Sequence, residues 1–457
     1  MIITFNDYLF AFLYFLLLLL LVIIVRNKTI HNPAIKKYFI PAFVVKVVGA
    51  MGIGMVYQYF YGFGDTFGYY NMGKFFLQAY NDGQASFREI FFTGDNEFYG
   101  NLGYQYNFSS WYAFNPQTII VARFSALFSL LGGGYYFTTA LFFALFSFAG
   151  IWQLFRTFFS LFPTLHKPLA WFILFLPSVF FWGSGLLKDS LSMTGLGFLT
   201  FNCFQLFIRR KKIGQSLLLI GLSAYLVFLV KAYILFSFVP AVLMWVLFEY
   251  RKRIRNRAIK RLLLPVILIL LVIGFGFLNN RLSLVYENLA LENVTKTALS
   301  VQQNIGAYES GSSYSIGQSD GSLFGFLKML FPALIVTLFR PFPWEISNIF
   351  SFISTLESMF FIWFTIRTFR KAGVKQFFNM VANKPIVLFC FTFAIIFAIA
   401  VGIASQNFGT LVRYKIPCMP FYLVGVLLVN YYATGETNPL TKKNQPRYRK
   451  IITRLPT

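Results

Sequence analysis

The sequence has few charged residues, cysteines and histidines, and each shortage excludes a class of protein. Only 12% of its 457 residues are charged, whereas a soluble protein carries roughly a quarter. The three cysteines, Cys203, Cys390 and Cys418, are dispersed, so their spacing predicts neither a disulfide framework nor a zinc site. Both histidines, His31 and His166, fall in turns that we predict to be cytoplasmic. This placement argues against histidine-based catalysis on the outer side.

Hydrophobic residues, by contrast, make up 57% of the chain, and the mean hydropathy is +0.64. Apolar runs of the roughly 20 residues that a bilayer core requires recur along nearly the whole length. We therefore predict an all-α polytopic membrane protein with about eleven transmembrane helices. The predicted spans lie near residues 8–25, 38–60, 136–155, 168–183, 189–208, 214–230, 232–250, 262–279, 347–368, 385–404 and 413–432.

The net charge of +25 is concentrated in short segments between the apolar runs, most densely at 251–261. Short basic loops face the cytoplasm and can pair with anionic lipid headgroups. With the N-terminus outside, eleven crossings place every basic cluster on one side. No basic segment is backed by a foldable soluble module, so we exclude nucleic-acid binding. We predict a bacterial cytoplasmic (inner) membrane protein with a cytoplasmic C-terminus.

The predicted organisation is one transmembrane domain over 1–435, followed by a basic cytoplasmic tail at 436–457. Two long connections, near 61–135 and 280–346, fall on the outer side. Each contains a short apolar stretch, which we predict to be an interfacial or re-entrant helix on the outer face. These stretches are 119–131 and 323–338.

Unusual polar groups gather at the predicted outer boundary, and the first of them is Asp65 among glycines and aromatic residues. The flanking glycines let the backbone bend tightly, so this carboxylate can approach a substrate hydroxyl. The alternative is that Asp65 caps a helix from Thr66 to Tyr80. A second group, Lys188 and Asp189, lies at the turn of an apolar hairpin and can bind and orient an anion. Its alternative is an ordinary hairpin tip, with Asp189 near a helix N-terminus.

Two more polar groups lie near the last predicted spans: one precedes the span at 347–368, and the other opens the span at 413–432. Two prolines stiffen the segment that carries Arg340 and Glu345, and a rigidly held guanidinium suits bidentate phosphate recognition. The alternative is a simple turn anchored by Trp344 at the interface. Arg413 and Lys415 oppose the positive-inside trend, which phosphate binding or snorkelling to headgroups explains.

Three further residues are weaker candidates. Arg123 and Lys231 can join the same outer surface. Glu357, near the middle of a predicted span, is expected to face the bundle interior because a carboxylate facing lipid is costly.

The run GDTFGYY around Asp65 resembles the first outer loop of GT-C-type glycosyltransferases, which are polytopic enzymes that use lipid-phosphate-linked sugars. The run RYKIPCMP, Arg413–Pro420, is similar to the Arg-Tyr-x-x-Pro run near the end of many such enzymes. The hairpin ending in WGSGLLKDS is of a kind common in bacterial proteins of this class. The resemblance implies that Asp65 is the catalytic carboxylate. Two departures are an extra crossing before the Asp65 loop and the lack of a soluble C-terminal domain.

The expected function is sugar transfer from a polyprenyl-phosphate-type donor to a glycan, lipid or protein acceptor at the outer face. Asp65 is the expected general base, and Lys188, Arg340 and Arg413 are expected to stabilise the phosphate. Asp189 and Glu345 would orient those cations or assist a divalent ion such as Mg²⁺ or Mn²⁺. Stacking against sugar or prenyl groups is expected from Tyr69 and Trp182.

Two other functions stay open. Repeat-unit polysaccharide polymerases or ligases of the Wzy or EpsG type share the multi-span layout, the outer-face site and arginines for phosphate. A flippase or transporter of lipid-linked oligosaccharides would instead place polar residues along a path through the bilayer, often on interrupted helices in matched halves.

Overall fold

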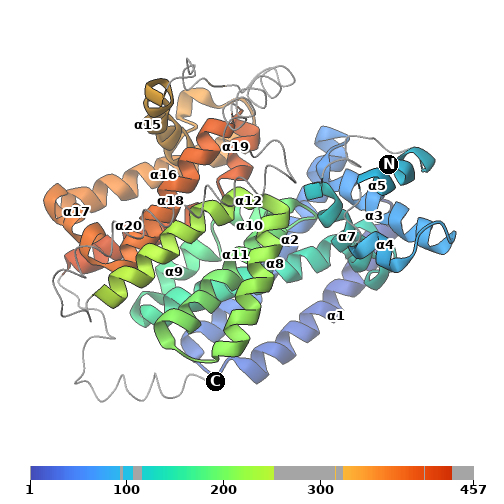
Figure 1. The fold of residues 1–457 in the computed structure, drawn as a ribbon, viewed down its shortest axis with the longest axis horizontal. Coiled ribbons are helices and arrows are strands. Elements are labelled where there is room, and N and C mark those ends of the chain that lie inside the picture. Colours follow the sequence, from blue (N-terminus) through green and yellow to red (C-terminus); the bar gives the residue numbers. More distant parts are fainter. Residues whose placement is uncertain are drawn as a thin grey trace. The chain divides into compact units, whose positions relative to one another are not determined.

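The computed structural model describes residues 2–92, 96–106, 116–251, 314, 323–405 and 407–434. Throughout this part of the chain the secondary structure is helical and contains no strand, which confirms the all-α prediction. The predicted span at 262–279 and the basic tail at 436–457 lie outside the described residues. The chain separates into two compact units that divide between Leu235 and Phe236. Figure 1 shows the labelled helices as ribbons. The prediction of a single transmembrane domain stays a prediction.

The first unit is built around α8 (Tyr136–Leu161), whose apolar face packs against α1, α2, α7 and α11. Its other helices are α1 (Phe5–Thr29), α2 (Pro33–Val56), η1 (Tyr57–Tyr61), α3 (Asp65–Asn81), α4 (Phe87–Phe92), α5 (Asn96–Gln105), α7 (Pro116–Leu131), η2 (Pro163–Leu165), α9 (His166–Ile173), α10 (Pro177–Trp182), α11 (Lys188–Cys203) and η3 (Phe204–Arg209). The long α12 (Ile213–Arg251) begins in this unit and continues into the second.

The second unit has the nearly fully buried α20 (Met419–Ala433) at its centre, packed against α16 and α18. Helix α18 also packs closely on α15, where the Thr337 hydroxyl donates a hydrogen bond of 2.8 Å to the carbonyl of Ala398. The remaining elements are α15 (Leu323–Phe339), η5 (Pro343–Glu345), α16 (Ile349–Ala372), α17 (Val374–Asn383), α18 (Pro385–Ala404) and α19 (Phe408–Tyr414).

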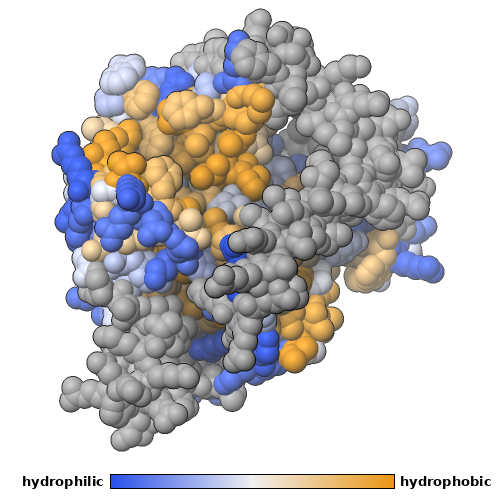
Figure 2. Space-filling view, turned by 60° about the vertical axis from the view of Figure 1, so that its left-hand side comes forward, coloured by the Kyte–Doolittle hydropathy of each residue, from blue (hydrophilic) through white to orange (hydrophobic). Residues whose placement is uncertain are grey.

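Seven helices in the described residues are long and apolar enough to cross a bilayer, and the bent pair of α19 and α20 raises the number to eight. The seven are Phe5–Thr29, Pro33–Tyr61, Tyr136–Leu161, Lys188–Arg209, Ile213–Arg251, Ile349–Ala372 and Pro385–Ala404. Figure 2 shows one face on which a broad hydrophobic area adjoins a hydrophilic band. Such segregation suits a surface in contact with lipid. The chain is thus a polytopic integral membrane protein.

The structure differs from the prediction at 168–183, where a single span was expected. This segment is divided between α9 and α10, of eight and six residues, and neither helix alone is long enough to cross. The reason is local, because Pro177 begins α10 and a residue that precedes proline avoids the helical region.

The two spans predicted at 214–230 and 232–250 form the one element α12, which is interrupted at Lys231. The backbone of Lys231 is not helical (φ −152°, ψ 80°), and this residue falls at the predicted break. At 1.5 Å per residue, 39 residues extend for about 58 Å, roughly twice the thickness of a hydrocarbon core. Its length is therefore sufficient for two spans.

The predicted outer connection at 61–135 is a folded helical region. Helix α3 packs along α7, and a hydrophobic cluster that includes the buried Phe76, Tyr99 and Ile119 joins them to α4 and α5. Arg123 of α7 links this helix to α4 and α5. Its guanidinium donates hydrogen bonds to the carbonyl of Ile90 at 2.9 Å and to the hydroxyl of Tyr99 at 2.6 Å. These contacts give Arg123 a structural role within the connection.

Candidate functional site

The turn before Asp65 is shaped by two glycines. Helix α2 ends in the π-helical turn η1, after which Gly62 (φ 76°) and Gly64 (φ 143°) take left-handed conformations that favour glycine. A Cβ atom at Gly64 would also collide with the ring of Tyr57. Gly64 is the N-cap of α3, and Asp65 is its first residue. The alternative that Asp65 itself is the cap therefore does not hold, although its charge is favoured in the first helical turn.

Tyr69 connects this turn to the start of α11. It lies four residues after Asp65 on α3, so the two side chains project from the same helix face. The Nζ atom of Lys188 lies over the Tyr69 ring, 5.8 Å from its centroid, in a cation–π geometry. The structure thus brings Asp65, Tyr69 and Lys188 into one neighbourhood of the first unit.

Asp189 is held by a lysine distant in sequence. Its carboxylate lies 2.5 Å from Nζ of Lys231, and both side chains are almost completely buried. The pair joins the first turn of α11 to the interruption of α12. Lys188 and Asp189 therefore have different partners, where the sequence predicted that they act as a pair.

The tip of the α10–α11 hairpin is buried inside the protein, from Trp182 to Leu187. Its position at the outer boundary stays a prediction. Only 7% of the surface of Trp182 is exposed. A buried loop must satisfy its backbone polar groups inside the protein. The carbonyl of Gly183 accepts hydrogen bonds from Nζ of Lys46 at 2.7 Å and from the Ser147 hydroxyl at 2.5 Å.

Lys46 is a residue of this site that the sequence analysis missed. It is fully buried in α2 and also donates to the carbonyl of Val179 at 3.2 Å. Helices α2 and α10 approach closely here, since a Cβ atom at Gly49 would collide with the carbonyl of Phe180. The available signal was a lysine inside an apolar run, which is costly unless it faces the protein interior.

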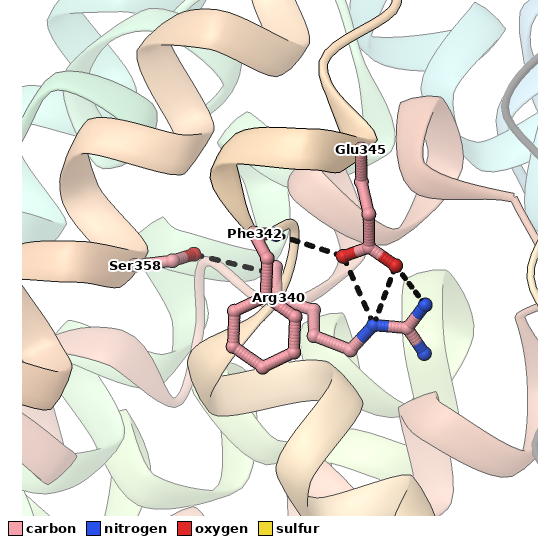
Figure 3. A network of polar contacts seen from close by, with 4 residues as sticks. All are labelled: Arg340, Phe342, Glu345 and Ser358. Carbon is pink, nitrogen blue, oxygen red and sulfur yellow. Dashed lines mark hydrogen bonds and ion pairs between the residues drawn. The ribbon is translucent and has the colours of Figure 1, made fainter.

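In the second unit, Arg340 and Glu345 form an ion pair across the turn that contains the two prolines (Figure 3). Nε of Arg340 lies 3.0 and 3.1 Å from the two carboxylate oxygens, and Nη2 also donates to Glu345. The amide of Phe342 donates to the same carboxylate at 2.7 Å. Burial raises the pKa of Glu345, but the hydrogen bonds and the charge of Arg340 outweigh it, so the pKa lies below its ordinary value.

Aromatic rings fix the other faces of this guanidinium. The Cζ atom of Arg340 lies 5.4 Å from the ring centroid of Tyr314 and 5.1 Å from that of Phe408. The Tyr314 hydroxyl in turn donates to the carbonyl of Ser405 at 2.6 Å. Arg340 is therefore rigidly positioned, and Glu345 already balances its charge.

Lys415 lies at the 65° bend between α19 and α20 and forms a hydrogen bond to the turn that carries Arg340 and Glu345. Its Nζ donates to the carbonyl of Arg340 at 3.0 Å and lies 3.5 Å from the Ser358 hydroxyl. Only 2% of Lys415 is exposed, which does not fit snorkelling to headgroups. Arg413 is buried in α19, and Glu357 is buried as predicted, close enough for its charge to act on Lys415.

The predicted site residues thus form two groups. Asp65, Tyr69, Trp182, Lys188 and Asp189 belong to the first unit, whereas Arg340, Glu345, Arg413 and Lys415 belong to the second. Their convergence on one substrate stays a prediction. Within the described ranges, no three His, Cys, Asp or Glu side chains lie together in a way that could hold a metal ion. Comparison with known proteins found no matching family model, curated protein or solved structure.

Proposed function

We propose that this protein is a membrane glycosyltransferase that moves a sugar from a polyprenyl-phosphate-type donor to an acceptor at the outer face of the bacterial cytoplasmic membrane. The observation that carries the proposal is the position of Lys188 over Tyr69, one helical turn after Asp65. A carboxylate and an ammonium group here flank one aromatic side chain. Sugar transfer from a lipid phosphate requires two of these groups, a base for the acceptor hydroxyl and a cation for the phosphate. The Tyr69 ring is buried, so it positions the cation and offers no stacking surface for the sugar.

The proposed reaction is a displacement at the anomeric carbon. The acceptor oxygen forms a bond to this carbon while its proton passes to the carboxylate of Asp65. The bond between the anomeric carbon and the phosphate oxygen breaks, and its electron pair leaves with the lipid phosphate. Lys188 stabilises this developing charge. The ion pair with Glu345 supports an orienting role for that carboxylate toward Arg340.

The proposed topology has eleven crossings, with the N-terminus outside and the C-terminus in the cytoplasm. In it, α9 and α10 form one broken crossing. Non-helical backbone at membrane depth is tolerated only where it is buried in protein or lines a water-filled cavity. The donors that Lys46 and Ser147 supply to Gly183 meet this requirement at the end of α10. The break of α12 at Lys231 supports counting that helix as two crossings.

The proposal is tested with purified protein in liposomes that contain a polyprenyl-phosphate sugar labelled in the sugar, together with candidate acceptors. We expect the label to become covalently bound to an acceptor as a single added sugar. A ladder of products of increasing length would instead indicate a polymerase. Label that crosses the bilayer while it stays on its lipid would reject transfer.

Transport is the second candidate function, and the two buried lysines at helix breaks favour it. Lys231 interrupts α12 in the first unit, and Lys415 lies at the bend between α19 and α20 in the second. Transporters commonly place ionisable groups at such interruptions. The same liposome experiment separates the candidates, because transport moves the intact lipid-linked sugar and forms no new glycosidic bond.

A further inference from the structure

The C-terminal end of α16 carries a surface groove of about 600 Å³. Its lining residues are Trp363, Ile366, Arg367, Arg370 and Lys371. All five side chains are exposed, so the groove is open to the surroundings. The groove combines one aromatic and one aliphatic wall with three cationic side chains.

Among the described residues, no carboxylate forms an ion pair with the cations of the groove. Arg367, Arg370 and Lys371 are spaced three and four residues apart, so they project from one side of the helix. From 349 to 405 the only carboxylate is Glu357. It lies ten residues before Arg367, where it is buried and acts on Lys415. The groove therefore presents positive charge suited to an anion.

The apolar part of the groove indicates that this anion carries a hydrocarbon portion. The guanidinium carbon of Arg367 lies 5.2 Å from the centroid of the Trp363 ring, half of whose surface is exposed. Tryptophan and arginine in such a pair are typical of the headgroup level of a membrane.

The next helix, α17, also suits the headgroup level of a membrane. Helix α17 buries Phe377 and Met380 against the unit and exposes Val374 and Phe378 together with Lys375. A short helix with exposed apolar and basic residues lies well in the plane of a membrane interface. The groove and α17 follow each other directly in the chain, so their composition suits the headgroup level for both.

We infer that the groove at the end of α16 binds the phosphate headgroup of an anionic phospholipid, with Arg367, Arg370 and Lys371 on the phosphate and Trp363 with Ile366 beside the start of the acyl chains. Free phosphate would use only the cations. The inference is independent of the proposed sugar transfer, because none of these residues belongs to the predicted catalytic site.

The test measures the thermal unfolding of the full-length protein in detergent while phosphatidylglycerol, phosphatidylcholine or inorganic phosphate is added. We expect the unfolding temperature to rise with phosphatidylglycerol and to rise much less with the other two. In R370Q/K371Q the apparent affinity for phosphatidylglycerol should fall by roughly tenfold or more, because each cation near an anionic lipid contributes to binding. In the single variants R370Q and K371Q, the apparent affinity for phosphatidylglycerol should fall by intermediate factors.

The matched control is R26Q/K28Q, which also removes one arginine and one lysine from the last turn of an apolar helix, α1. It should bind phosphatidylglycerol like the unmodified protein. An equal loss in this control would assign the effect to general electrostatic attraction and overturn the inference. So would unchanged binding in folded R370Q/K371Q, or an equal response to inorganic phosphate.

Discussion

The ammonium group of Lys231 lies 2.5 Å from the carboxylate of Asp189, and the two residues are 42 positions apart in sequence. Lys231 is also the residue at which α12 stops being helical. The ion pair therefore ties the interruption of one apolar helix to the first turn of another. Both charges are almost fully removed from solvent, so each stabilises the other in the protein interior.

Removal of one member of this pair is expected to be costly. Asp189→Asn or Lys231→Met should each lower the free energy of unfolding by about 3–5 kcal/mol, because each removes the ion-pair partner of a buried charge. The combined replacement D189N/K231M should cost less than the sum of the two. Unfolding in detergent, analysed as a double-mutant cycle, measures this coupling. Strict additivity of the two single effects would contradict it.

Replacement of Asp65 by Asn should reduce sugar transfer by roughly 10² to 10⁴-fold, the typical contribution of a general base. The labelled polyprenyl-phosphate sugar provides the measurement. The control is Asp82→Asn, which alters a carboxylate at the other end of the same helix, where it accepts a hydrogen bond from Tyr106. D82N should retain activity, and an active D65N protein would remove Asp65 from the mechanism.

Lys46→Met should destabilise the first unit, because the buried carbonyl of Gly183 loses an ammonium donor. The expected loss is about 1.5–3 kcal/mol, the typical contribution of a hydrogen bond to a charged group, because the Gly183 carbonyl keeps the Ser147 hydroxyl as a donor. Lys74→Met is the control, since Lys74 is exposed on α3. Thermal unfolding compares the two variants. A higher unfolding temperature in K46M would show that burying the charge costs more than its hydrogen bonds contribute.

The ion pair between Arg340 and Glu345 should make stability depend on pH. The pKa of Glu345 is lowered in the folded protein by Arg340 and by the amide of Phe342. Its contribution is therefore complete above the pKa of the unfolded chain and is lost as the pH falls through the folded value. Unfolding temperatures measured from neutral to acidic pH should show a gap between the unmodified protein and E345Q that closes on acidification. A gap independent of pH would contradict this assignment.

Much of the helical framework could be predicted from the sequence, because the length of an apolar run is a local property. The break at Lys231 was predicted for the same reason, since a lone charge divides two apolar runs. The segment at 168–183 was misjudged because hydropathy averages over Pro177, which divides the segment into α9 and α10.

The polar partners could not be predicted, because they depend on contacts between distant segments. Lys188 and Asp189 are adjacent in the chain, but a helix directs neighbouring side chains to different sides. One therefore meets Tyr69 of α3 and the other Lys231 of α12. Arg340 and Glu345 are five residues apart, so the two prolines were a sufficient local signal that these residues are held in fixed positions.

The buried hairpin tip also constrains the order in which the protein can be made. Lys46 of α2 and Ser147 of α8 hold the carbonyl of Gly183, and both leave the ribosome before Gly183 does. The growing chain can thus place α2 and α8 in the bilayer first, as a prepared receptor for the later α10–α11 hairpin.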